Sequence, residues 1–223
     1  MIWRIAMLTM QLGLLAMAGL AFLLGPLSAP IFDRAQGMFI SNDGSFRRLA
    51  WDAQTEDSSA MGQAARVFSD YPAALVLFYE EEISGEAYFA RMADFYPGRQ
   101  RRALLLLAEI ERRTASAMRP LLERHGLAVA GAAGLAAAGR TEAEQQSGAT
   151  WQKLVAEMAS GFPVFVAEFE QLEQLAPASD RSLISVLTRH EVAAIKFAQL
   201  EDAGNTESLR PLEEFLAGLS DSA

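Results

Sequence analysis

The chain contains no cysteine, which excludes thiolate metal ligands, disulfide bonds and cysteine nucleophiles. Basic residues are also scarce: 19 lysines and arginines stand against 28 aspartates and glutamates, for a formal net charge of −9. A nucleic acid is therefore not an expected partner, because little would neutralise its phosphates. Strand-type alternation, phosphate-binding glycine loops, nucleophile elbows and HExxH motifs are missing as well. These absences favour an all-α fold and point to no enzyme class.

Hydrophobic residues make up 51% of the 223 residues, enough for one domain with a sizeable core plus an appendage. The run from Ile5 to Leu27 is uncharged and long enough to cross the ~30 Å hydrocarbon core of a bilayer. We predict a transmembrane anchor over residues 1–31, single-pass in a bacterial inner membrane. A cleaved signal peptide ending near Leu27-Ser28-Ala29 is the alternative. Arginines flank the run on both sides, so the side of the membrane that carries the rest of the chain stays open.

Residues 32–70 are predicted to connect the anchor to a helical domain at 71–223. The sequence Ser41-Asn42-Asp43-Gly44 is typical of a turn. A short helix is expected around Met61 to Phe68.

The helical domain is expected to hold four long helices and a short fifth. Only Pro97-Gly98 separates the first two long helices, and only Pro177-Ala178 separates the last two. A long connection of about 20 residues at 127–149 joins the two pairs. Short connections make antiparallel neighbours, so this pattern predicts an antiparallel four-helix bundle with one crossover. The expected helices cover residues 71–96, 99–125, 150–176, 179–204 and a segment within 206–219.

Local signals mark the ends of these helices. Asp70 and Thr150 are suitable N-cap residues, because their side chains can accept hydrogen bonds from the first turn. Gly126 is suited to end the second helix. Pro163 is expected to kink the third helix.

Two glutamates lie in the middle of apolar helix faces. At the helical period, Leu75 and Phe78 share the face of Glu82, and Leu107 and Met118 share the face of Glu111. A carboxylate in a core is costly unless it is paired, protonated or bound to a metal. Glu82 and Glu111 are therefore the strongest indication of a functional site in the sequence.

The run Glu80-Glu81-Glu82-Ile83-Ser84-Gly85-Glu86-Ala87-Tyr88-Phe89 resembles the first metal-ligand helix of the ferritin-like di-iron carboxylate superfamily. In that superfamily a glutamate is followed by an aromatic pair. The resemblance implies a ferritin-like bundle over residues 71–219. It also implies a metal site built from a glutamate on two helices and Glu-x-x-His on the other two.

The ligand set implied by this resemblance is incomplete. Glu82 and Glu111 match the glutamates of the first two helices, and His190 faces the core from the fourth. The residue three positions after Glu111 is Thr114, and the residue three positions before His190 is Leu187. Neither Glu-x-x-His motif is intact, so the usual di-iron chemistry is not expected.

The carboxylates and the imidazole that are present could still hold a single Fe, Mn or Zn ion. Two metal-free alternatives stay open. The two core carboxylates could share a proton, or they could pair with core-reaching arginines such as Arg112 or Arg189 while the histidine is a satisfied core residue. The candidate ligands are Glu82, Glu86, Glu111, His190 and Glu191.

Two functions follow from these features. The first is an accessory or assembly subunit of a membrane complex, docked through its N-terminal helix and carrying a degenerate carboxylate/histidine site. The alternative is a mononuclear or di-metal carboxylate oxidoreductase or a metal-handling protein.

Overall fold

The structure is a computed structural model that describes residues 32–33, 38–40, 46–48 and 64–220. The chain divides into two compact units, Met1–Met61 and Gly62–Ala223. The anchor predicted at residues 1–31 lies outside the described residues. Among the residues that are described, no helix is both long enough and apolar enough to cross a membrane.

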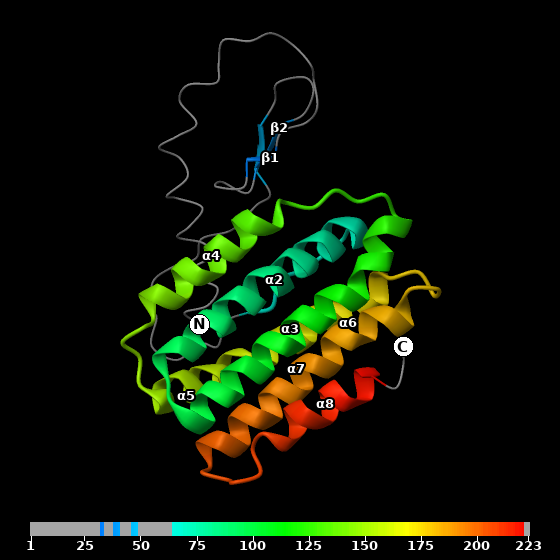
Figure 1. The fold of residues 1–223 in the computed structure, drawn as a ribbon. Coiled ribbons are helices and arrows are strands. Elements are labelled where there is room, and N and C mark those ends of the chain that lie inside the picture. The colour runs from blue at the N-terminus through cyan, green and yellow to red at the C-terminus, as the bar shows by residue number, and fades with distance from the viewer. Residues whose placement is uncertain (1–31, 34–37, 41–45, 49–63, 221–223) are drawn as a thin grey trace, which may run out of the picture. The chain divides into compact units, whose positions relative to one another are not determined.

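The first unit holds a small antiparallel sheet of three strands in the order β1-β2-β3. Figure 1 labels two of the strands, β1 and β2. Phe39 of β2 lies opposite Phe32 of β1 and Arg47 of β3. The sequence predicted no strand here, because strands of two or three residues are too short to show an alternating pattern. The turn predicted at residues 41–44 lies outside the described residues. The strands are β1 (Phe32–Asp33), β2 (Met38–Ile40) and β3 (Phe46–Arg48).

All regular elements described in the second unit are helices, which confirms the all-α prediction for this part of the chain. Residues 64–70 form no regular structure, so the helix expected around residues 61–68 is wrong over its described part. The elements are α2 (Tyr71–Met92), a 3₁₀ turn at Ala93–Phe95, α3 (Gly98–Arg124), α4 (Ala132–Gln145), α5 (Trp151–Gly161), α6 (Pro163–Leu175), α7 (Arg181–Asp202) and α8 (Arg210–Ser220).

The helix ends predicted at Asp70 and Gly126 are confirmed by their capping geometry. The Asp70 carboxylate accepts a hydrogen bond from the amide of Ala73 at 2.8 Å at the start of α2. Gly126, just beyond α3, has a φ of 61°, a conformation that glycine adopts without strain. At Pro163 the expected kink is a full break, which divides the predicted third helix into α5 and α6.

The long helices pack around one core (Figure 1). Helix α2 lies against α3, α3 against α7, α7 against both α5 and α6, and α6 against α2. Helix α8 covers α7 and α3. Large apolar side chains fill the centre, among them Phe78, Leu104 and Leu187, each fully buried. The core therefore lies where α2, α3, α6 and α7 meet.

The connection predicted at residues 127–149 contains a 14-residue helix, α4, which lies along the outside of α2 (Figure 1). The two backbones approach closely at Gly139, where an added Cβ would lie 2.0 Å from the carbonyl oxygen of Ser84. Alanine and glycine dominate the first half of α4, so it lacks the broad apolar stripe that marks a core helix in a sequence. Contact through small residues explains why the pattern did not predict its packing.

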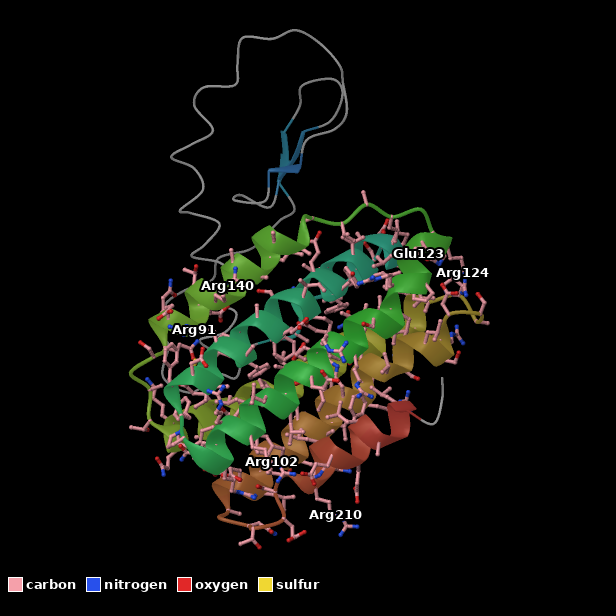
Figure 2. All side chains as sticks on the ribbon, viewed as in Figure 1. Arg91, Arg102, Glu123, Arg124, Arg140 and Arg210 are labelled. Atoms are coloured by element: carbon pink, nitrogen blue, oxygen red, sulfur yellow. The ribbon has the colours of Figure 1, made fainter. Side chains whose placement is uncertain are left out.

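Charged side chains occupy the outside of the bundle, as the labelled Arg91, Arg102 and Arg210 show in Figure 2. Arg102 pairs with Glu213 across α3 and α8 at 2.6 Å. Exposed pairs of this kind contribute about 0–1 kcal/mol each, so the buried core decides stability.

Candidate metal centre

Three helices that are far apart in the sequence bring one polar side chain each to the same point in the core. Glu82 comes from α2, Glu111 from α3 and His190 from α7. Each offers one ligand atom, and these atoms all lie within 4.8 Å of one another. The site that the apolar-face pattern indicated at these three positions is thus assembled by the packing of α2, α3 and α7.

The site is closed off from solvent. Glu82 and His190 are each only 3% exposed. Glu111 is partly exposed as a whole residue, but its carboxyl group is buried with the other two. Unpaired charge would be expensive at this depth, so the ionisation of these groups is set by their mutual contacts.

Gly85 provides the space for the Glu111 carboxyl group. It lies one turn after Glu82 on α2, and a Cβ at this position would approach Oε2 of Glu111 to 2.8 Å. Glycine inside a helix costs about 0.5–1 kcal/mol relative to alanine. Its use here lets α3 place a carboxyl group directly against the backbone of α2.

The carboxyl groups of Glu82 and Glu111 are hydrogen-bonded to each other. Burial, reinforced by the neighbouring Glu111, raises the pKa of Glu82 well above its ordinary value. Burial likewise raises the pKa of Glu111, to about 7. Protonated Glu82 is therefore the donor to Glu111, which is the shared-proton arrangement anticipated for two close carboxylates.

His190 is held by the residue next to it in the sequence. Its Nε2 lies 3.2 Å from Oε2 of Glu191, and its Nδ1 lies 3.6 Å from Oε2 of Glu82. Burial lowers the pKa of His190, so the ring is neutral at physiological pH. We assign the proton to Nε2, because Glu191 can accept it there. The lone pair of Nδ1 then faces the two glutamates.

Two atoms of this group lack a hydrogen-bond partner although they are buried: Oε2 of Glu82 and Nδ1 of His190. They face each other at 3.6 Å. Two ligands in a tetrahedral zinc site, each about 2.1 Å from the metal, lie about 3.4 Å apart. The spacing of these two atoms therefore fits a metal ion between them.

Aromatic rings flank the histidine on two sides. Phe169 of α6 meets the ring of His190 edge-on at 5.7 Å between centroids, and Phe215 of α8 does so at 6.4 Å. Phe169 is buried, whereas Phe215 is half-buried. Two aromatic side chains therefore form the apolar wall beside the imidazole.

Neither arginine named as a partner for the core glutamates reaches them. Arg112 pairs with Glu109 at 2.6 Å on the surface of α3, and Arg189 bonds to the carbonyl oxygen of Ser185 at 3.4 Å. Over residues 64–220, no ion pair joins an arginine to either glutamate of the site. The arginine-paired alternative is thus wrong, because both side chains lie on exposed helix faces.

The other predicted ligands lie outside the group of three. Glu86 is half-buried on α2, and burial raises the pKa of its carboxyl group. Arg112 of α3 opposes this rise in pKa, and Glu109 of α3 adds to it. Glu191 contacts the far nitrogen of the histidine and is placed to orient the ring. As ligands, both remain predictions.

Another buried carboxylate, that of Glu168 on α6, lies outside the group of three. It is fully buried, and it accepts hydrogen bonds from the backbone amide of Arg66 at 2.6 Å and from its Nε at 3.0 Å. The guanidinium of Arg66 also binds Glu81 at 2.7 Å. Arg66 lay in the expected connector, and no local pattern there indicated that it pairs with a buried carboxylate of α6.

Comparison of the chain with protein-family models, with curated proteins and with solved structures found no match. The class of protein is therefore inferred from the site alone: over residues 64–220 it is an all-helical protein with a buried Glu/Glu/His group that could hold a metal ion.

Proposed function

We propose that this protein has a ferritin-like bundle and binds one divalent transition-metal ion at Glu82, Glu111 and His190. Its function is then to handle metal ions or to act as a metal-dependent oxidoreductase. The observation that carries the proposal is the pair of buried, unpartnered atoms, Oε2 of Glu82 and Nδ1 of His190, 3.6 Å apart. In a folded core such atoms are rare unless water or an ion satisfies them.

Two carboxylates and one imidazole, with no thiolate, suit Fe, Mn or Zn. Three protein ligands leave a coordination position open, as in catalytic rather than structural metal sites. A bound ion would supply Lewis acidity, or redox chemistry if it is iron or manganese. Glu191 holds the imidazole in the tautomer that ligates through Nδ1. Binding would release the proton that Glu82 and Glu111 share.

We also propose where the protein resides. The uncharged run at 5–27 would anchor the chain in a bacterial inner membrane, and the helical domain would lie at the surface of that membrane. The membrane is then the first partner of the protein.

Elemental analysis tests the metal site. The full-length chain is purified in mild detergent from cells supplied with Fe, Mn and Zn, and its metal content is compared with that of Glu111→Gln. The matched control is Glu142→Gln, which changes another buried glutamate, on α4, outside the group of three. We expect about one ion per chain in wild type and control and a large loss in Glu111→Gln. Metal-free wild-type protein, or equal content in all three, would refute the proposal.

A second candidate is an accessory or assembly subunit whose core site holds no metal. The observation that favours it is the hydrogen bond between the Glu82 and Glu111 carboxyl groups, which satisfies part of the site without an ion. Such a protein would be purified metal-free and folded, and it would co-purify with membrane proteins through the N-terminal segment. Stoichiometric metal that Glu111→Gln removes would argue against this candidate.

A further inference from the structure

The buried imidazole of His190 contacts an aromatic side chain that is itself partly exposed to solvent. Phe215 of α8 lies edge-on to the His190 ring, with 6.4 Å between centroids, and is itself half-buried. The other aromatic neighbour of the imidazole, Phe169, is only 3% exposed and lies inside the core. Of these two rings, therefore, Phe215 alone also reaches solvent.

Helix α8 presents this ring from a fixed position. Leu209 and Leu212, just before and within the first turn of α8, are 5% and 0% exposed and pin the start of the helix into the core. Glu213 adds an ion pair to Arg102 of α3 at 2.6 Å. These contacts hold the start of the helix, so the movement that the inference below needs is a rotation of the Phe215 side chain rather than a displacement of α8.

We infer that Phe215 is the gate of the buried site: its ring controls the exchange of a metal ion and of small molecules between solvent and the Glu82/Glu111/His190 group. The inference rests on the proposed function, because a gate is useful only if the site binds an ion. The contact between Phe215 and His190, however, does not depend on bound metal. With the ring turned outward, the imidazole would lose the half-buried ring that packs against it.

The rate at which a reagent modifies His190 measures how accessible the imidazole is to solvent. Diethyl pyrocarbonate acylates neutral imidazole nitrogen, and the chain contains two histidines, so mass spectrometry can follow each one. The side chain of His125 is 26% exposed and lies far from α8 in the sequence, which makes it an internal reference. The reaction is run on full-length, chelator-treated protein in detergent.

Three variants are compared with wild type. Phe215→Ala removes the ring, Phe215→Trp enlarges it, and Leu219→Ala truncates another half-buried side chain one turn further along α8. We expect Phe215→Ala to accelerate acylation of His190 by about tenfold or more, since access to a buried group follows its opening equilibrium. Phe215→Trp should slow it, and Leu219→Ala should leave it unchanged. The rate at His125 should be equal throughout.

Equal rates at His190 in wild type, Phe215→Ala and Leu219→Ala would overturn the gate. If circular dichroism shows that Phe215→Ala does not fold, Phe215→Trp decides: slower acylation supports the gate and an unchanged rate overturns it. The proposed function fails in a different experiment, when wild-type protein takes up no metal. A metal-binding chain whose histidine reacts equally fast in all variants would keep the function and lose the gate.

Discussion

Replacing Glu111 by glutamine should change how the stability of the metal-free protein depends on pH. In the folded chain the Glu111 carboxyl group has a pKa of about 7, against an ordinary value of 4.5, because it is buried. The folded chain therefore holds a proton at pH values where the unfolded chain has released it. Stability is fully present below pH 4.5 and falls as the pH rises through about 7.

The size of this effect follows from the two pKa values. At about 1.4 kcal/mol per pH unit, the difference between 4.5 and about 7 corresponds to about 3 kcal/mol of unfolding free energy lost between pH 4 and pH 8. Glutamine has nearly the same shape and does not ionise. Glu111→Gln should thus lack this loss of about 3 kcal/mol. The variant should therefore be more stable than wild type at pH 8 when no metal is present.

Urea denaturation of chelator-treated, full-length protein at several pH values between 5 and 8 measures the effect. Glu142→Gln is again the control, since burial also raises the pKa of Glu142, to about 8, at a place outside the site. Glu142→Gln should change the pH dependence without changing metal content, whereas Glu111→Gln should change both. A wild-type protein that is as stable at pH 8 as at pH 5, or a Glu111→Gln variant with the wild-type slope, would refute the reasoning.

Three further outcomes are expected. Arg66→Met should destabilise the protein by about 3 kcal/mol in urea denaturation, because it removes the guanidinium that pairs with the fully buried Glu168; a change below 1 kcal/mol would contradict this. Gly139→Ala should lower the unfolding free energy by about 1–3 kcal/mol, because its Cβ would meet the carbonyl oxygen of Ser84 at 2.0 Å, whereas the control Gly134→Ala has nothing within 4 Å and should not destabilise. Metal affinity, measured by chelator competition, should fall steeply as the pH drops from 8 to 6, because the ion must displace protons from the two glutamates of the site; an affinity independent of pH would count against carboxylate ligation.

Part of this structure could be predicted from the sequence. Glu82, Glu111 and His190 sit in the middle of apolar faces at the helical period, and helices that bury those faces bring the three side chains together. Helix ends at Asp70 and Gly126 could be predicted because capping is a local property of a few residues.

The remainder depends on contacts that no local pattern encodes. Helix α4 packs through alanine and glycine, which leave no amphipathic signature. Arg66 lies in an irregular segment, and only the fold shows that it neutralises Glu168. Glu191 was expected as a ligand, whereas its contact with Nε2 of His190 becomes visible only when the ring orientation is known.

The close approaches on either side of one turn of α2 have a consequence for how the site responds to an ion. Gly85 meets the Glu111 carboxyl group on one side of the helix, and the carbonyl oxygen of Ser84 meets Gly139 of α4 on the other. This turn of α2 therefore has a close neighbour on each side, a side chain of α3 at Gly85 and the backbone of α4 at Ser84, and both contacts restrict its movement. Glu82 lies less than one turn earlier on the same helix, so the same contacts restrict its backbone. Its carboxyl group is preorganised by steric exclusion, so an arriving ion would have little of the helix backbone to rearrange.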